Sequence, residues 1–258
     1  LPSDQQGMQL DTLPALLVKH QPKLIYCIPN FNNPTGRCLS ESRRHQLLHL
    51  ARAAGVPILE DDYVGDLRYS GKKLPSLRSL AAPGEVIYVS TFSKMLLPSM
   101  RIGYLVADQP HYTQLARLKH VDSFTSSNLI QRALDAFVTV GRYDKQLRRA
   151  CRLYRQHRDV MVEALSYTLP PDCQFEIPDG GLFIWLQLPQ NAPISRLMPL
   201  AWQAGVTFAK GGGFHTQEAD GDFTLRLNFA ANSPELITQG ITRLSAAIRE
   251  CGAEKSPA

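Results

Sequence analysis

The sequence predicts an α/β fold with a mostly parallel sheet, followed by a smaller α+β unit. Two observations lead to this fold class. In the first part of the chain, short apolar runs without polar alternation are separated by helical patterns or long connections, which is typical of parallel strands covered on both faces. From about residue 108 the pattern changes to long amphipathic helices, and strand patterns return only after them.

The strands of the first part are apolar runs that end in turn residues. They cover residues 23–29, 56–61 and 85–90, and a fourth run, RIGYLVA, covers residues 101–107. Between the first two runs, residues 39–55 have helical periodicity, with a serine as the N-cap candidate and Gly55 at the C-terminal end. This order of strand, helix and strand predicts parallel pairing.

The second part begins with a long amphipathic helix at roughly residues 143–166. The strand candidates that follow are CQFEIP, GGLFIWLQLP, GVTFA and FTLRLNFA. Helices are predicted from Ile194 and from Ser233-Pro234, where serine is the N-cap and proline the first helical residue. We therefore expect two domains, residues 1–142 and residues 143–258, the second starting with the connecting helix.

The composition excludes several classes of protein. A chain of 258 residues with 44% hydrophobic residues can bury a substantial core. No apolar run approaches the roughly 18 residues of a membrane span, and the first residues do not have the pattern of a signal peptide, so we expect no membrane association and a cytoplasmic location. The five cysteines are widely spaced and show no metal-binding pattern, which favours reduced thiols.

The net charge of +5 is unevenly distributed, because residues 142–158 hold seven arginines and lysines against the single acid Asp144. The favoured interpretation is a solvated helix face whose aliphatic stems lie on the core. The alternative is a patch that binds nucleic acid. The sequence contains no helix-turn-helix, zinc-finger or ribonucleoprotein pattern.

Polar residues follow three successive predicted strands. Asn33 lies in an NPTG segment after the first strand, Asp61 and Tyr63 come at the end of the second, and Lys94 follows the third. Ligands of open α/β sheets bind at the carboxyl ends of parallel strands, so we expect these groups to converge on one ligand.

This set of side chains fits pyridoxal phosphate. Lys94 is suited to form a Schiff base with its aldehyde, and Asp61 to keep the ring nitrogen protonated, so that the ring accepts electron density. Asn33 and Tyr63 are suited to bind the phenolic oxygen. Taken alone, Lys94 would be a surface lysine; the ordered motifs around it favour the functional interpretation.

The phosphate of such a cofactor needs hydroxyl donors and a guanidinium group, which Thr91, Ser93 and Arg101 provide in the residues around Lys94. Two glycine clusters, Gly180-Gly181 and Gly211-Gly212-Gly213, do not have the spacing of phosphate-binding loops. We expect them to form backbone bends near strand ends.

The motifs NNPTG, EDDY, STFSK and SMRIGY occur in this order and resemble the class I/II aminotransferases of fold type I, over essentially the whole chain. The resemblance implies the fold of the pyridoxal phosphate-dependent transferases (the aspartate aminotransferase fold). Residues 1–142 would be the C-terminal part of the large cofactor-binding domain, and residues 143–258 the small domain. LLPSMRIGYLV, GGLFIWL and LRLNFA are most similar to MocR regulators, in which a GntR-type winged helix-turn-helix is fused to an aminotransferase-like domain.

The resemblance also assigns roles to individual residues. It implies that Lys94 is the Schiff-base lysine and Asp61 the partner of the ring nitrogen, and that Arg226 in FTLRLNFA pairs with a substrate carboxylate. The other implied cofactor ligands are Asn33, Tyr63, Thr91 and Arg101.

Two functions are compatible with these residues. The favoured one is the effector-sensing domain of a MocR/GntR-type transcriptional regulator, which binds an amino acid or amine and reaches DNA through an upstream domain. The alternative is a free-standing aminotransferase that acts on an amino acid and a 2-oxo acid, with Lys94 as the base that transfers a proton. The resemblance further implies a homodimer and a chain truncated at its N-terminal end, since the family's phosphate cup and stacked aromatic residue precede the matching region.

Overall fold

The computed structural model describes residues 1–253, which form two compact units. The first unit comprises Leu1–Asn32 and Arg37–Cys151, and the second comprises Asn33–Gly36 and the chain from Arg152 onward. The division falls inside the long helix α6 (Arg142–Thr168), nine residues after the boundary that the sequence suggested. Four residues of the NPTG segment are grouped with the second unit although both flanks belong to the first.

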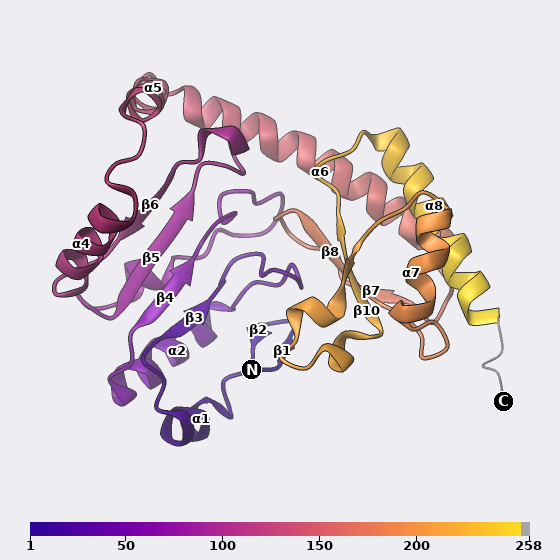
Figure 1. The fold of residues 1–258 in the computed structure, drawn as a ribbon, viewed down its shortest axis with the longest axis horizontal. Coiled ribbons are helices and arrows are strands. Elements are labelled where there is room, and N and C mark those ends of the chain that lie inside the picture. Colours follow the sequence, from indigo (N-terminus) through magenta and orange to yellow (C-terminus); the bar gives the residue numbers. More distant parts are fainter. Residues whose placement is uncertain (254–258) are drawn as a thin grey trace. The chain divides into compact units, whose positions relative to one another are not determined.

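The first unit is built on a four-stranded sheet (Figure 1). Its strands lie in the order β3 (Ile25–Cys27), β4 (Ile58–Asp61), β5 (Val86–Thr91) and β6 (Gly103–Val106). The first three are parallel and β6 is antiparallel to β5. The connection from β5 to β6 is too short for the crossover that a parallel partner requires, so the fourth predicted strand returns in the opposite direction.

Helix α2 (Glu41–Ala54) lies where sequence periodicity placed a helix, and local capping explains its ends. The Ser40 side chain accepts a hydrogen bond from the backbone N–H of Arg43, at 3.4 Å. At the other end, Gly55 adopts a left-handed conformation, with φ of 66°.

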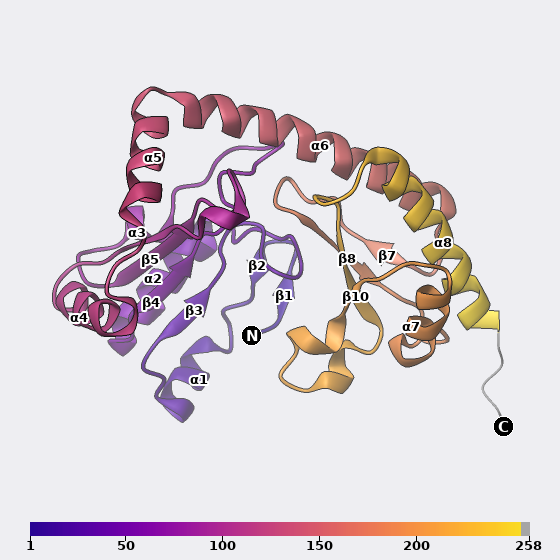
Figure 2. The same ribbon diagram turned by 45° about the horizontal axis from the view of Figure 1, so that its top comes forward.

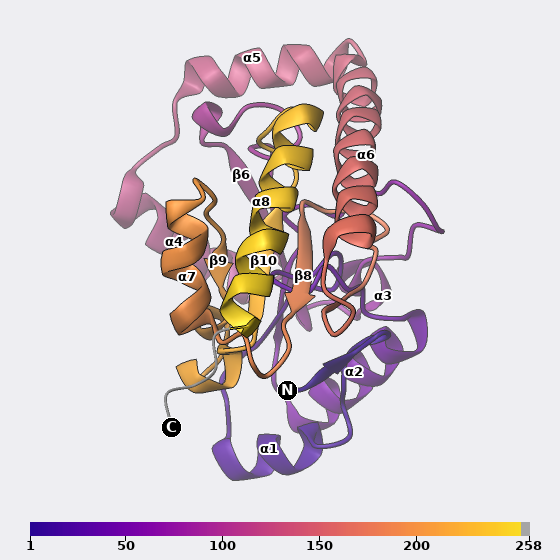
Figure 3. The same cartoon turned by 90° about the vertical axis from the view of Figure 1, so that its right-hand side faces the viewer.

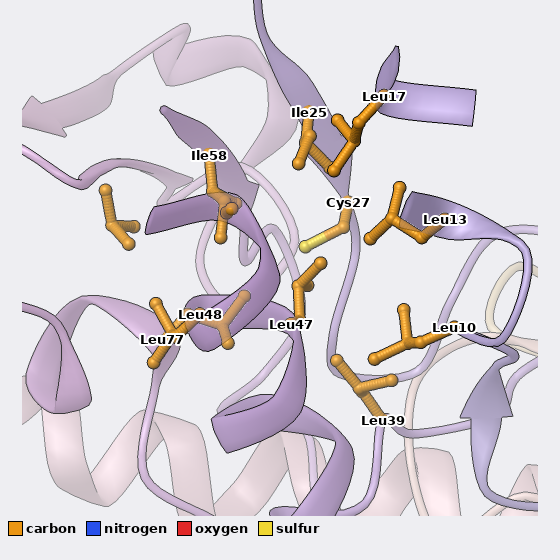
Figure 4. Close-up of a cluster of buried hydrophobic side chains, with 12 residues drawn as sticks. Leu10, Leu13, Leu17, Ile25, Cys27, Leu39, Leu47, Leu48, Ile58 and Leu77 are labelled. Atoms are coloured by element: carbon orange, nitrogen blue, oxygen red, sulfur yellow. The ribbon is translucent and has the colours of Figure 1, made fainter. Parts of the chain in front are cut away.

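One face of the sheet packs into an apolar core with α1 (Leu13–His20), α2 and α3 (Leu77–Leu80), as Figure 4 shows. The core includes Ile25 and Cys27 of β3, Ile58 of β4 and Val86 of β5. The N-terminal hairpin of β1 (Ser3–Asp4) and β2 (Gly7–Met8) is attached to α2, because both terminal nitrogens of Arg43 donate to the Asp4 carboxylate. Figure 2 shows α1 and α2 close to β3 and β4.

The helical segment expected after residue 108 consists of α4 (His111–Ser123), α5 (Asn128–Thr139) and α6. Six of the seven basic residues between 142 and 158 are exposed, as a solvated helix face requires. Arg158 is buried and donates to the Pro178 carbonyl, at 2.8 Å, and to the neighbouring Asp159.

The second unit contains an antiparallel sheet covered by helices. The strand order is β7 (Gln174–Phe175), β8 (Phe183–Gln187), β10 (Thr224–Asn228) and β9 (Ala209–Lys210). Its buried face carries Ile184, Leu186, Leu225 and Leu227. Helix α7 (Ile194–Gln203) packs against α8 (Pro234–Ala253), as Figure 3 shows. The GVTFA run was expected to be a strand, but β9 includes only its last residue, because Val206 closes a backbone turn onto Ala201.

None of the five cysteines forms a disulfide in the structure. Within residues 1–253, no helix combines the length and apolarity that crossing a membrane requires. The same residues contain no group of three or more histidines, cysteines or acids arranged to hold a metal ion.

Candidate active site

Lys94 lies in the connection between β5 and β6. Its side chain is exposed, whereas Ser93 and Met95 on either side are buried. The loop is closed by Thr91, whose hydroxyl donates to the Ile102 carbonyl and accepts from the Ser93 N–H, both at 3.1 Å. Buried neighbours therefore hold the backbone while the amino group stays accessible.

The same connection carries the residues predicted to bind phosphate. Arg101 is exposed and caps the 3₁₀ helix η1 (Pro98–Met100) in a left-handed conformation, with φ of 51°. Ser93 is 7% exposed. The Thr91 hydroxyl already donates its proton to the Ile102 carbonyl. It can therefore donate to a phosphate only if this hydrogen bond breaks.

The neighbouring acids Asp61 and Asp62 have different partners. Asp61 ends β4 in register with Val89 of β5 and accepts a hydrogen bond from the Tyr26 hydroxyl, at 2.7 Å. The Asp62 carboxylate accepts from Asn30 and from the Tyr88 hydroxyl, each at 2.9 Å. Asp62 thus belongs to a local network of the fold, which supports Asp61 as the acid suited to a cofactor.

Tyr63 follows these acids and lies near the chain that leaves β3. Its hydroxyl is 3.5 Å from the Phe31 carbonyl oxygen. Phe31 itself is buried and has a positive φ of 49°. The tyrosine predicted to bind the phenolic oxygen therefore reaches the segment immediately before the NPTG motif.

The second unit contains the other two predicted residues, and they are in contact. A terminal nitrogen of Arg226, on β10, donates to the side-chain oxygen of Asn33. The Arg226 guanidinium also lies over two aromatic rings, 4.0 Å from the centroid of Phe183 and 4.9 Å from that of Phe214. The polar face of β10 therefore carries a guanidinium held by an amide and two rings.

Close glycine packing positions one of these rings. Gly211 and Gly212 begin the 3₁₀ helix η2 (Gly211–Phe214), which ends at the ring over Arg226. A Cβ atom at Gly211 would lie 1.9 Å from the Thr224 hydroxyl, and one at Gly212 would lie 2.7 Å from the Glu218 carbonyl oxygen. These glycines thus serve the backbone bend that the sequence predicted and, in addition, place Phe214 over the arginine.

Sequence reasoning did not identify Tyr26, Asn30, Tyr88, Phe183 or Phe214. The only signal for Tyr26 was a polar group inside an apolar strand run, and for Phe214 its place after three glycines. Partial burial and the bond to Asp61 raise the pKa of Tyr26, so its hydroxyl remains a neutral donor. Burial and the neighbouring Asp62 raise the pKa of Tyr88 in the same way.

A cavity of about 640 Å³ in the first unit lies beside Asp62 rather than Asp61. Its lining includes Asn30, Arg68, Tyr88 and Tyr104. Lys94 and Asp61 are not part of the lining, so this cavity does not mark the predicted cofactor residues.

The residues of the first unit fit pyridoxal phosphate in their chemistry. An exposed lysine and an exposed arginine share the connection after β5, and a carboxylate held by a tyrosine ends the adjacent strand. These are the groups that an aldehyde, a phosphate and a ring nitrogen require. The fold and these residues together define a pyridoxal phosphate-dependent transferase-like protein.

Comparison with known proteins identifies the family. The model of the aminotransferase class I and II family matches residues 1–244, and the chain belongs to this family, whose cofactor is pyridoxal phosphate. The kynurenine aminotransferase of Pyrococcus horikoshii, whose crystal structure contains PMP, superposes with a TM-score of 0.92 at 33% identity, covering 97% of this chain and 63% of that one.

Curated relatives include both enzymes and regulators. Aromatic-amino-acid aminotransferase 1 of Thermococcus litoralis is 33% identical over 256 residues, which are 97% of this chain and 61% of the relative. YisV of Bacillus subtilis, named an uncharacterized HTH-type transcriptional regulator, is 33% identical over 196 residues, or 76% of this chain and 40% of the relative. The chain thus spans about three fifths of the enzyme and less than half of the regulator.

Proposed function

We propose that this chain binds pyridoxal phosphate and takes part in the transfer of an amino group between an amino acid and a 2-oxo acid. The observation that carries the proposal is Arg226, whose guanidinium is held by Asn33 and two aromatic rings in a chain that also presents an accessible lysine. A guanidinium fixed in this way is suited to bidentate binding of a planar carboxylate. Amino acids and 2-oxo acids share such a carboxylate.

Pyridoxal phosphate supplies an aldehyde and an electron-accepting ring that stabilises negative charge at the substrate α-carbon. The Lys94 amino group would hold the cofactor covalently and, when released, move the proton at the α-carbon. The Asp61 carboxylate would hold the proton on the ring nitrogen.

The remaining predicted residues would orient the cofactor. Arg101 would contribute a guanidinium to the phosphate, and Ser93 and Thr91 hydroxyl groups. Tyr63 would donate to the phenolic oxygen. Asn33 would bind the same oxygen, and its side chain also accepts a hydrogen bond from Arg226.

The test measures product rather than binding alone. The protein is loaded with pyridoxal phosphate and incubated with single amino acids, starting with aromatic amino acids and 2-aminoadipate because relatives are named for them. We expect stoichiometric formation of the 2-oxo acid and of pyridoxamine phosphate, both measured by mass spectrometry. Neither product with any amino acid, although the cofactor is bound, would contradict the transfer function.

The second candidate is the effector-sensing domain of a transcriptional regulator, favoured by the relatives named as HTH-type regulators. In that case an amino acid or amine changes the absorbance of the bound cofactor without net formation of a 2-oxo acid. Binding of DNA would belong to a separate upstream domain, so the decisive control is the full-length protein with and without its effector. In either case we expect a homodimer, which sedimentation velocity would detect.

A further inference from the structure

Tyr26 donates a hydrogen bond to Asp61 and has no role in the proposed function described above. It lies on β3, opposite Leu59 of the neighbouring parallel strand β4. Its side chain reaches two residues further along β4, and its hydroxyl donates to the Oδ2 atom of Asp61 at 2.7 Å. A residue 35 positions earlier in the chain therefore holds the carboxylate that ends β4.

The pair does not contribute to the apolar core. Tyr26 is 55% exposed, and it lies between Ile25 and Cys27, which point to the core on the other face of the strand. A hydrogen bond at such an exposed position contributes little to folding. Tyr26 is thus placed to act on the orientation of Asp61 more than on the stability of the sheet.

A second tyrosine makes the corresponding contact with the next acid. Tyr88, on β5, donates to Oδ2 of Asp62 at 2.9 Å, and Asn30 donates to the other oxygen. Both oxygens of Asp62 are therefore engaged within the fold. Tyr88 provides a matched control, because its phenol also donates a hydrogen bond to a carboxylate, that of Asp62 immediately after β4, which we assign to the fold.

We propose that Tyr26 is a positioning residue that orients the Asp61 carboxylate toward the ring nitrogen of pyridoxal phosphate. A phenol bound to one carboxylate oxygen restricts rotation of the carboxylate and leaves the other oxygen for the ring N–H. The inference rests on the proposed function, since Asp61 acts on a cofactor only if one binds.

The test compares two cofactors that differ only at the ring nitrogen. Dissociation constants are measured by absorbance titration for pyridoxal phosphate and for its analogue with carbon in place of that nitrogen. The ratio of the two constants gives the preference for the nitrogen-containing ring. A substitution that weakens the binding of both cofactors equally leaves this ratio unchanged. The Tyr26→Phe variant removes only the hydroxyl, and Tyr88→Phe removes the matched hydroxyl next to Asp62.

We expect Tyr26→Phe to reduce this preference about three- to tenfold, which is the size of effect that one ordinary hydrogen bond has. Tyr88→Phe should leave the preference within twofold of the original protein. An unchanged or increased preference in Tyr26→Phe would overturn the inference, and so would an equal reduction in both variants.

Asp61→Asn separates failure of the inference from failure of the proposed function. If Asp61→Asn lowers the preference and Tyr26→Phe does not, Asp61 keeps its role and Tyr26 loses the one proposed here. If Asp61→Asn leaves the preference unchanged, the carboxylate does not contact the ring nitrogen. The roles proposed for Asp61 and for Tyr26 are then both wrong.

Discussion

At the scale of single residues, the side chain of Lys94 is accessible while its neighbours Ser93 and Met95 are buried. This arrangement suits a lysine that reacts with an aldehyde, because the amino group is accessible while the backbone is held in place. Its reactivity can be tested without any knowledge of the substrate.

We expect pyridoxal phosphate followed by borohydride to label the protein at Lys94, because reduction makes the bond between lysine and aldehyde permanent. Peptide mass spectrometry locates the label. Lys94→Ala should lose it, whereas Lys72→Ala, which removes another exposed lysine, should retain it. A label of unchanged stoichiometry in Lys94→Ala would remove Lys94 from the site.

The two adjacent acids should respond in opposite ways to the same substitution. Asp61→Asn is expected to lower the rate of amino-group transfer by orders of magnitude with little change in stability, because the ring nitrogen loses its anionic partner. Asp62→Asn should instead lower the free energy of unfolding by about 1–3 kcal/mol, since Tyr88 and Asn30 lose a charged acceptor. Transfer rates and urea unfolding are measured on both variants. The reverse pattern would exchange the two roles.

Arg226 makes two kinds of contact that lysine cannot reproduce. Arg226→Lys removes the bidentate geometry and the planar stacking on Phe183 and Phe214, so we expect carboxylate ligands to bind about 10- to 100-fold more weakly. Binding of pyridoxal phosphate itself should change little. An amine without a carboxylate is the control ligand, and an equal loss of affinity for both ligands would show that Arg226 does not bind the carboxylate.

At the scale of elements, Glu60 connects strand β4 to helix α3. Its side chain is fully buried and accepts hydrogen bonds from the backbone N–H groups of Leu77 and Arg78, at 2.9 and 2.8 Å. These N–H groups lie at the start of α3, where a helix has no partner of its own for them. Burial raises the pKa of Glu60, while the two N–H bonds oppose that shift.

We expect Glu60→Gln to lower the free energy of unfolding by about 1–3 kcal/mol, because an amide has one acceptor oxygen and leaves one helix N–H without its acceptor. Urea unfolding measures the loss. Glu41→Gln, an exposed acid in the first turn of α2, is the control and should change stability by less than about 0.5 kcal/mol. Equal effects of the two substitutions would show that burial of Glu60 is not the cause.

At the scale of the whole molecule, the NPTG segment belongs to the second unit although the chain on either side of it belongs to the first. Gly36 has a φ of 73°, and a Cβ atom there would lie 3.2 Å from the Phe183 carbonyl oxygen and 3.2 Å from Pro178. Both neighbours belong to the second unit, which also contains the Asn33 and Arg226 pair. The conformation of Gly36 therefore supports the segment that carries Asn33, the partner of Arg226 in the proposed carboxylate site.

Gly36→Ala should lower the free energy of unfolding by about 1–3 kcal/mol and also weaken the binding of carboxylate ligands. Gly55→Ala introduces the same strain at a φ of 66° with no atom within 4 Å, so it should lower stability without affecting these ligands. Calorimetry and ligand titration distinguish the two effects. Normal ligand affinity in Gly36→Ala would show that the segment tolerates the shift.

The fold class, the family and the local elements follow from the order of residues alone. Helix α2 follows from periodicity and from its Ser40 and Gly55 caps, which act within a few residues of each other. The β3, β4 and β5 strands follow from apolar runs, and Asn33, Asp61 and Lys94 were recognised because they follow those strands in order.

The side chains that hold the predicted residues in place become known only from the three-dimensional packing. The hydroxyl of Tyr26 meets Asp61 across 35 residues, and Arg226 meets Asn33 across 193. The burial of Glu60 and the stacking of Phe214 on Arg226 likewise depend on how distant elements pack. Periodicity and capping are local, whereas a contact between distant side chains depends on strand register and on the path of every intervening loop, which residue order alone does not specify.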